Sequence, residues 1–295
     1  MLESLTKPAM PANRIALVIH AGAGLYPKHL ERAKNIQEKL RKFCERGYLF
    51  LKNHTALETA VEVTRWLEDW PETNAGVGAM LQSDGVARLS ASLMDGYEKR
   101  FSGVINIEKI KNPILVASLL QTERDRILAS DGALCFAKEK GFKRFDLCTK
   151  ESIKRWHALR KKNHYGTVGV CALDSKGRLA AATSTGGKGM ERVGRVSDSA
   201  LPAGNFANDY AAVSATGIGE EIVEEALASI LVTRATDLKN LEKSFKETFK
   251  EAKKRKRKLA AIGLDRNGKI FWAHTAEILY YAFQNNSGLG GFRLQ

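Results

Sequence analysis

The sequence contains few cysteines, no closely spaced cysteine pair and no long apolar run. Cys44, Cys135, Cys148 and Cys171 are too scattered for a disulfide framework or a zinc site, so we expect neither. No segment approaches the roughly 20 apolar residues that a membrane-spanning helix needs. The first residues, "MLESLTKPAMPANR", are polar and interrupted by proline, unlike a signal peptide. We therefore expect a cytoplasmic protein with no membrane partner.

Acidic residues are outnumbered, because 33 Asp and Glu face 47 Lys and Arg and leave a net charge of +14. Such an excess favours anionic partners without specifying a fold. The run "KKRKRK" at 253–258 raises the alternative of a basic nucleic-acid-binding protein. Six consecutive charges on a helix point in every direction, however, and no aromatic residues alternate with them to stack on bases. We interpret the run as a solvated helix end and expect no specific nucleic-acid partner.

The hydrophobic pattern places paired helices and consecutive antiparallel hairpins in each half of the chain. At 295 residues the chain could form one large domain or two smaller ones. This pattern predicts the α+β class, with sheets in the middle and helices outside. The segment 142–166 is basic and weakly periodic, and we expect an exposed linker with some helix. Strands are predicted at 14–24, 87–96, 101–110, 167–173, 179–187, 209–217 and 259–275, and helices at 29–51 and 130–140 and from about residues 55, 112, 220 and 238.

Local signals predict where several helices begin and end. Thr55 and Glu58 have the spacing of a capping box. Asn112 and Pro113 are typical of an N-cap followed by a first helical residue. Gly141 stands where glycine is favoured after a helix.

Three histidines lie near predicted strands. His20 and His274 fall within apolar strands, and we interpret both as hydrogen-bonded core residues rather than ligands. His164 lies close to the glycine–threonine pair discussed next, but the sequence gives it no role.

Thr167 directly follows Gly166 and begins an apolar strand. One interpretation is a β-branched residue at a strand start, which is common. The alternative is a self-cleaving nucleophile, since cutting the preceding peptide bond would give Thr167 a free amine of pKa about 7.7–8.0. Nucleophile and general base would then belong to one residue. Gly166 lacks a Cβ and can adopt the strained backbone that such a cut requires.

Small and hydroxyl-bearing residues fill the neighbouring strand, "LAAATSTGG". Such a strand is typical of close approach by another backbone or a ligand. Strand alternation places Thr183 and Thr185 on one face. This hydroxyl-bearing face favours the interpretation of Thr167 as a self-cleaving nucleophile.

Two later clusters have the chemistry of a binding site. Arg195 and Asp198 could clamp the carboxylate and ammonium of a free amino acid, although such a pair alone is more often a surface salt bridge. Thr216, Gly217 and Gly219 precede a predicted helix, where N–H groups and a hydroxyl can hold an oxyanion.

These motifs in this order resemble the type-2, or plant-type, isoaspartyl peptidases/L-asparaginases, which are N-terminal nucleophile hydrolases. The matching segments lie within about residues 14–280 and include "IHAGAG", "NAGVGAMLQSDGVARLSASLMDG", "GTVGVCALDSKGRLAAATSTGG", "GRVSDS" and "AAVSATGIGEE". The resemblance implies a four-layer αββα sandwich made as a precursor that cuts itself between Gly166 and Thr167. Residues 1–166, with a basic linker at about 142–166, would form the α-subunit and residues 167–295 the β-subunit of one folded domain.

The resemblance also implies roles for individual residues. The implied catalytic residues are Thr167 as nucleophile, Thr185 beside it, Thr216 and Gly217 as the oxyanion hole, and Asn74 as support for Thr216. The implied substrate-binding residues are Arg195 for the α-carboxylate, Asp198 and the Gly219 carbonyl for the α-ammonium, and Gly187. No cofactor is implied for catalysis. A structural sodium ion is implied on the main-chain carbonyls of Leu67, Glu68, Trp70, Thr73, Ala75 and Val77.

The expected activity is hydrolysis of β-aspartyl (isoaspartyl) dipeptides and L-asparagine to L-aspartate, by a homodimer of αβ units. The clamp fits these substrates because both α-groups of the aspartyl unit are free. A glycosylasparaginase-like amidase is one alternative, but such an enzyme would normally carry a secretory signal. A threonine endopeptidase is another, but the clamp for a carboxylate and an ammonium indicates small substrates. Ser197 replaces the usual family glycine, and Glu191 and Arg192 are expected near the pocket rim, so these residues affect substrate ranking.

Overall fold

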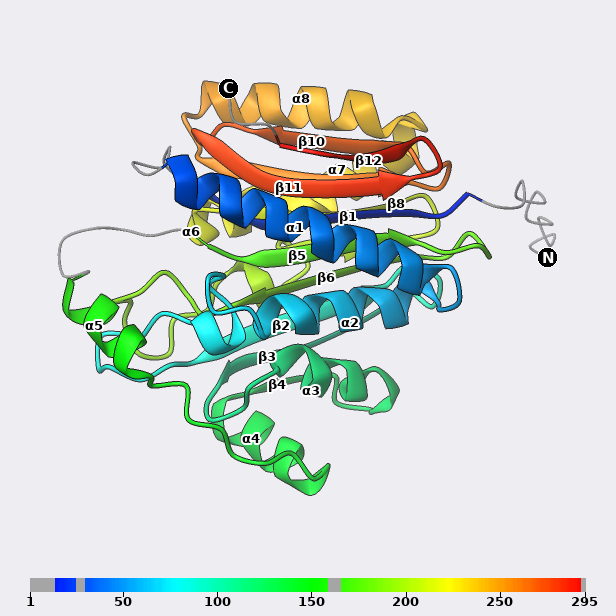
Figure 1. Ribbon diagram of the computed structural model, residues 1–295. Helices are drawn as coiled ribbons and strands as arrows, with labels where there is room; N and C mark the ends of the chain where they lie inside the picture. The colour runs from blue at the N-terminus through cyan, green and yellow to red at the C-terminus, as the bar shows by residue number, and fades with distance from the viewer. Residues whose placement is uncertain (1–13, 25–29, 159–165, 293–295) are drawn as a thin grey trace.

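The computed structural model describes residues 14–24, 30–158 and 166–292 and has a mixed α and β structure (Figure 1). Residues 25–29 and 159–165 lie outside these ranges. They include His29, His164 and the part of the basic linker just before Gly166. The strands are β1 (Ala16–Gly24), β2 (Leu89–Asp95), β3 (Arg100–Ile107), β4 (Ile127–Ala129), β5 (Val168–Leu173), β6 (Leu179–Thr185), β7 (Asn205–Ala207), β8 (Ala211–Gly217), β9 (Leu259–Asp265), β10 (Ile270–His274), β11 (Ile278–Asn285) and β12 (Gly288–Gly291). The α-helices are α1 (Leu30–Leu51), α2 (Ala56–Glu68), α3 (Pro113–Leu119), α4 (Ser130–Glu139), α5 (Lys150–Ala158), α6 (Gly219–Glu224), α7 (Leu227–Leu238) and α8 (Leu241–Lys254).

The strands form two sheets that pack against each other. The larger sheet has the order β12-β11-β1-β5-β6-β2-β3-β4, and the smaller has the order β10-β9-β8-β7. Helices α1 to α4 pack on the larger sheet, as Figure 1 shows for α1 and α2, while α7 and α8 pack on the smaller one. The central strands β5 and β6 contact β8 of the smaller sheet.

Alternation along the strands divides the buried side chains between cores. In β1, Leu17 and Ile19 join the core under the helices of the larger sheet, whereas Ala16 and Val18 face the smaller sheet. Alanine is frequent between the sheets, with Ala181 and Ala212 among the fully buried residues there. Small side chains allow the two sheets to approach closely around the glycine–threonine pair.

The predicted strands and turns are confirmed. β5 and β6 pair antiparallel over the "TVGVCAL" and "LAAATSTGG" segments, and β9 and β10 form the second hairpin across the Asn267–Gly268 turn. β4, β7, β11 and β12 were not predicted from the sequence. β11 pairs with β1 and, with β12, extends the larger sheet on that side.

The helix signals are confirmed in part. The capping box of Thr55 and Glu58 starts α2, and Gly141 follows α4 with a positive φ of 84°. Asn112 precedes α3, but its side chain makes no capping bond and instead donates to Asp69. None of the helices in the described ranges is both long and apolar enough to cross a membrane.

Three predictions in the second half of the chain need correction. The helix expected from residue 220 is divided into α6 and α7, because Ala226 adopts a left-handed φ of 46°. The next helix, α8, begins at Leu241, and it ends at Lys254, so most of the basic run 253–258 is not helical. His274 is exposed on β10 and contacts the Ala276 carbonyl, so it is not a core residue.

His20, in contrast, is the buried and hydrogen-bonded core histidine that the sequence predicts. Its Nε2 lies 3.0 Å from Ser214 Oγ, which in turn lies 3.0 Å from Thr183 Oγ1. Burial lowers the pKa of His20 to about 3, against a hydrogen bond with the Thr167 backbone that raises it. The ring is therefore neutral at physiological pH, and it links both sheets directly behind Thr167.

Replacing Gly169 with alanine should destabilise this network. A Cβ there would lie 2.0 Å from Ser214 Oγ and 2.3 Å from His20 Nε2, so one of the two must shift. We expect Gly169→Ala to lower the free energy of unfolding by about 1–3 kcal/mol, measured by urea denaturation. Gly132→Ala is the matched control, because no atom lies within 4 Å of that Cβ, and it should not destabilise. Equal losses in both variants would contradict the packing argument.

Candidate active site

A small cavity of about 120 Å³ opens where β5 begins and β6 and β8 end. It brings together segments that are far apart in the sequence. Most of the residues singled out from the sequence lie in its lining, although Asn74 and Thr216 do not. The lining residues are Gly166, Thr167, Thr185, Gly187, Lys188, Arg195, Ser197, Asp198, Gly217, Ile218, Gly219 and Glu220.

The carbonyl of Gly166 accepts two hydrogen bonds at the bond between Gly166 and Thr167. Asn74 Nδ2 donates to it at 2.9 Å and Thr185 Oγ1 donates at 3.1 Å. Thr167 Oγ1 donates to Thr185 Oγ1 at 3.4 Å, so a hydroxyl lies beside this polarised carbonyl. This arrangement suits attack by a hydroxyl on the carbonyl before it.

Asn74 has different partners from the one that the family resemblance implies. Its amide also donates to the Gly187 carbonyl, and its Oδ1 accepts from the Met80 backbone. Thr216 Oγ1 is buried and has no hydrogen-bond partner among the described residues, so direct support by Asn74 is not seen. Thr216 thus lies behind Gly217 of the cavity lining with an unpaired hydroxyl.

Gly217 follows Thr216 at the end of β8, where the backbone requires glycine. Its φ is 138°, and a Cβ would lie 2.5 Å from the Lys258 carbonyl oxygen. Any other residue would therefore displace the N–H group that the sequence analysis gives to the oxyanion hole.

Arg195 forms an ion pair with Glu220 and not with Asp198, its expected neighbour. Its Nε lies 2.7 Å from Glu220 Oε1 and its Nη2 lies 2.8 Å from Oε2. The hydrogen bonds from Arg195 lower the pKa of Glu220 to about 2, although burial opposes them. Lys188 Nζ lies 3.5 Å from the same carboxylate. No role for Glu220 or Lys188 was predicted from the sequence. Glu220 is 25 residues from Arg195 and 32 residues from Lys188, so the contacts leave no local pattern.

Asp198 is a buried carboxyl group, with 2% of its surface exposed. Burial raises its pKa to about 6, while a hydrogen bond from Ser197 and the charge of Arg195 oppose that rise. Ser197 Oγ donates to Asp198 Oδ1 at 2.7 Å. Asp198 can therefore face a substrate ammonium as a carboxylate above about pH 6, and Ser197 helps to keep it ionised.

The chain is similar to known proteins over most of its length. Residues 13–292 match the asparaginase family. The chain belongs to this family. An isoaspartyl peptidase/L-asparaginase of Nostoc sp. is 43% identical over 93% of each chain, and one of Synechocystis sp. is 41% identical over 93% of this chain and 89% of its own. A plant-type L-asparaginase of Pyrococcus furiosus is 33% identical over 91% and 96% of the two chains. The family predicted from the motifs is confirmed.

In this asparaginase-family chain, Glu191 lies beneath the cavity and not at its rim. Only 4% of its surface is exposed, and burial raises its pKa. A Cβ on Gly187 would lie 1.8 Å from its carboxylate, and Gly187 has a φ of 82°. Gly187 therefore cannot take a side chain without moving Glu191. Arg192 is exposed and does not line the cavity.

The loop that follows α2 turns its oxygens inward. Thr73 Oγ1 lies 2.6 Å from the Leu67 carbonyl and 2.8 Å from the Trp70 carbonyl. Glu68 is fully buried, and its Oε2 has no partner among the described residues. No group of three acidic, cysteine or histidine residues there could hold a metal. Main-chain oxygens of this loop fit a hard cation such as sodium, which prefers oxygen ligands, whereas the Glu68 carboxylate accepts from Ser184 and from the Ile114 backbone.

Proposed function

We propose that the chain cuts itself between Gly166 and Thr167 and then hydrolyses β-aspartyl dipeptides and L-asparagine to L-aspartate. The observation that carries the proposal is the Gly166 carbonyl, which two donors polarise beside the Thr167 hydroxyl. The Nostoc and Synechocystis relatives, both named isoaspartyl peptidase/L-asparaginase, support the choice of substrates.

Self-cleavage begins when Thr167 Oγ1 attacks the carbonyl carbon of Gly166. Negative charge then develops on the Gly166 oxygen, where Asn74 Nδ2 and Thr185 Oγ1 already donate. A donor of this kind contributes on the order of 10²–10³ in rate. Collapse breaks the C–N bond, and the nitrogen of Thr167 takes up the proton that the hydroxyl gave up, so the amine is free and Gly166 is joined to Thr167 Oγ1 as an ester. Water then hydrolyses this ester, which restores the Thr167 hydroxyl and leaves a carboxylate on Gly166.

In the mature enzyme, the Thr167 amine accepts the proton of its own hydroxyl as Oγ1 attacks the β-carbonyl of the substrate. Thr216 Oγ1 and the Gly217 N–H stabilise the oxyanion. The amine then protonates the leaving group, and water releases L-aspartate from the ester on Thr167. Arg195 binds the α-carboxylate, while Asp198 and the Gly219 carbonyl bind the α-ammonium.

The size of the cavity favours small substrates. About 120 Å³ of space, closed on one side by a charged clamp, suits an aspartyl unit better than an extended peptide. These features support the dipeptidase and asparaginase activities over a threonine endopeptidase.

We also propose the finer architecture of the family. In the described residues, one apolar core lies between the first helices and the larger sheet, another between the two sheets, and a third between the smaller sheet and the last helices. This order of layers supports the four-layer αββα sandwich. Division into subunits 1–166 and 167–295 follows from the proposed cut. The dimer of αβ units and the cytoplasmic location stay predictions.

The loop after α2 would hold a structural sodium ion. The carbonyl groups of Leu67, Glu68, Trp70, Thr73, Ala75 and Val77 are its proposed ligands. The ion would neutralise the converging carbonyl dipoles and so fix the backbone that carries Asn74. It has no part in the chemical steps.

Mass spectrometry of denatured, aged protein tests the proposed cut. Wild type should give two fragments, the second beginning at Thr167, and should hydrolyse L-asparagine. Thr167→Ala should remain a single inactive chain, because it lacks the attacking hydroxyl. The exposed Thr122→Ala is the control and should mature normally. An intact wild-type chain that hydrolyses β-aspartyl dipeptides would refute the mechanism.

The pKa of Asp198 predicts a change of slope in the acidic limb of the pH profile. The Thr167 amine must be unprotonated to act as base, so kcat/KM for L-asparagine should fall below about pH 8. Protonation of the Asp198 carboxylate should steepen that fall below about pH 6. Ser197→Ala removes a bond that favours ionisation of Asp198, so the steeper part should begin at a pH about one unit higher. Ser199→Ala is the control, because Ser199 Oγ lies 3.5 Å from Asp198 and contributes little. An unchanged onset of the steeper part in Ser197→Ala would show that another group sets it.

Exchange of sodium for choline tests the ion site without an activity assay. A ligand that binds only the folded state stabilises it by about 2.7 kcal/mol at a hundredfold excess over Kd. The midpoint of thermal unfolding should therefore be several degrees higher in sodium chloride than in choline chloride of equal concentration. Equal midpoints would rule out a stabilising sodium ion.

A further inference from the structure

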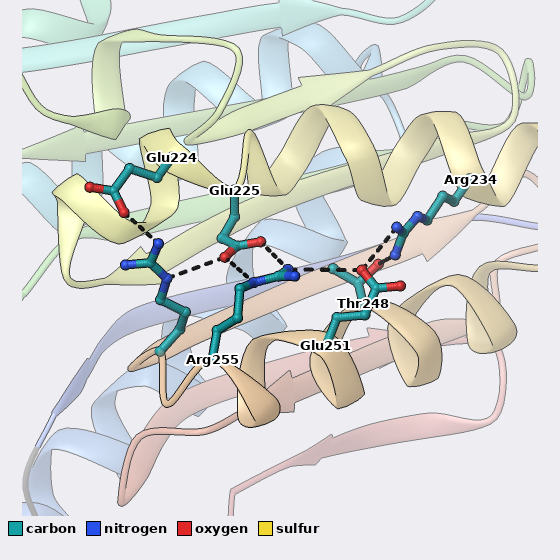
Figure 2. Close-up of polar contacts among 7 residues, drawn as sticks. Glu224, Glu225, Arg234, Thr248, Glu251 and Arg255 are labelled. Carbon is teal, nitrogen blue, oxygen red and sulfur yellow. Dashed lines mark hydrogen bonds and ion pairs between the residues drawn. The ribbon is translucent and has the colours of Figure 1, made fainter.

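The basic run 253–258 is largely exposed, as the sequence predicts, but its two arginines, 47% and 27% exposed, also form ion pairs. Arg255 donates through Nε and Nη2 to both carboxylate oxygens of Glu225, as Figure 2 shows. Arg257 Nε lies 3.2 Å from Glu225 Oε1, and its Nη2 contacts Glu224. The arginines thus form ion pairs with the C-terminal end of α6, the helix that begins next to the cavity.

Helix α6 has little of its own to keep it in place. It contains six residues, of which Gly219 and Ile222 are buried. Isolated helices this short are unstable, so tertiary contacts must hold them. Yet its first residues carry active-site contacts, since Gly219 lines the cavity and Glu220 holds Arg195.

The segment that follows α8 also touches the oxyanion hole directly. The Ile218 N–H donates to the Lys258 carbonyl at 3.1 Å, and Gly217 pairs with Leu259. The Lys258 N–H in turn donates to Glu221 Oε2 at 2.6 Å. A shift of the segment 255–258 would therefore move the backbone of Gly217.

We propose that Arg255 and Arg257 are positioning residues for the oxyanion segment 216–219, acting through Glu224 and Glu225. This inference rests on the proposed hydrolase function. It gives the basic run a role in catalysis and not in nucleic-acid binding. The arginines touch no substrate, and they act by fixing α6 and the start of β9 relative to each other.

The burial of Glu225 strengthens these ion pairs. Its side chain is 12% exposed, compared with 56% for Glu224, so solvent screens its charge less. Burial raises the pKa of Glu225, but the hydrogen bonds and charges of Arg255 and Arg257 outweigh it, and the pKa is lowered. Glu225 is therefore ionised at neutral pH and joins both arginines.

The same network offers a matched control at Arg234. This residue of α7 bonds Glu251 and Thr248 of α8 at 2.9 Å and 3.0 Å, and it appears at the other end of Figure 2. Its side chain is 29% exposed, close to the 27% of Arg257. Removing the charge of Arg234 breaks a comparable ion pair away from residues 216–221, and Glu251 keeps its longer contact, 3.8 Å, with Arg255.

Arg257→Gln and Arg234→Gln should separate positioning from stability. We expect kcat for L-asparagine to fall about tenfold in Arg257→Gln, less than the loss of an oxyanion donor, and to be unchanged in Arg234→Gln. Both should lower the midpoint of thermal unfolding to a similar extent. Rates are divided by the amount of fragment beginning at Thr167, so that incomplete maturation does not enter kcat. Equal kcat in Arg257→Gln and wild type, or equal losses in both variants, would overturn the proposal.

A double-mutant cycle tests the path through Glu225. If both residues act through one contact, Glu225→Gln combined with Arg257→Gln should lose no more kcat than the worse single variant, whereas independent effects would multiply. Multiplying effects would refute this path. Arg257→Lys keeps the charge without the forked donor; it should fold and give an intermediate kcat, and wild-type kcat would count against the proposal. An inactive wild type would instead refute the hydrolase function itself.

Discussion

The hydrogen bonds on the Gly166 carbonyl are the interaction on which the site depends. One donor, Asn74, comes from the loop after α2, and the other, Thr185, comes from the end of β6. Asn74 can approach because two glycines beside it lack side chains. A Cβ on Gly166 would lie 2.8 Å from Asn74 Cβ, and one on Gly186 would lie 2.9 Å from Asn74 Oδ1. The packing of the loop against the end of the sheet and the chemistry at Thr167 therefore depend on the same glycines.

Features set by neighbouring residues could be predicted from the sequence. The capping box at Thr55, the β5–β6 hairpin and the shared face of Thr183 and Thr185 depend on local spacing, and the structure contains them. The pairing of Arg195 with Glu220 could not be predicted, because it joins residues brought together by β8 and α6. The division between α6 and α7 rests on the left-handed backbone of Ala226, a conformation that alanine rarely adopts and does not signal.

Net charge proved a poor guide to what the basic residues do. The whole chain carries +14, yet the arginines in the run 253–258 form ion pairs with Glu224, the last residue of α6, and Glu225, its C-cap. The same is true at the cavity, where Arg195 and Lys188 share Glu220. Composition gives only the number of charges, whereas the fold determines which charged side chains form pairs. The ion pairs of Glu220, Glu224 and Glu225 lie in or next to α6, which borders the cavity.

One apolar core has a consequence for the mature enzyme. It takes Leu17 and Leu40 from before residue 166 and Val168 and Val170 from after it. Once the chain is cut, the fragments stay together through this core without a covalent link. Denaturation would then separate two molecules, and recovery would become a bimolecular reaction that dilution slows. The uncut precursor folds without that penalty, so the enzyme would assemble easily once and reassemble with difficulty afterwards.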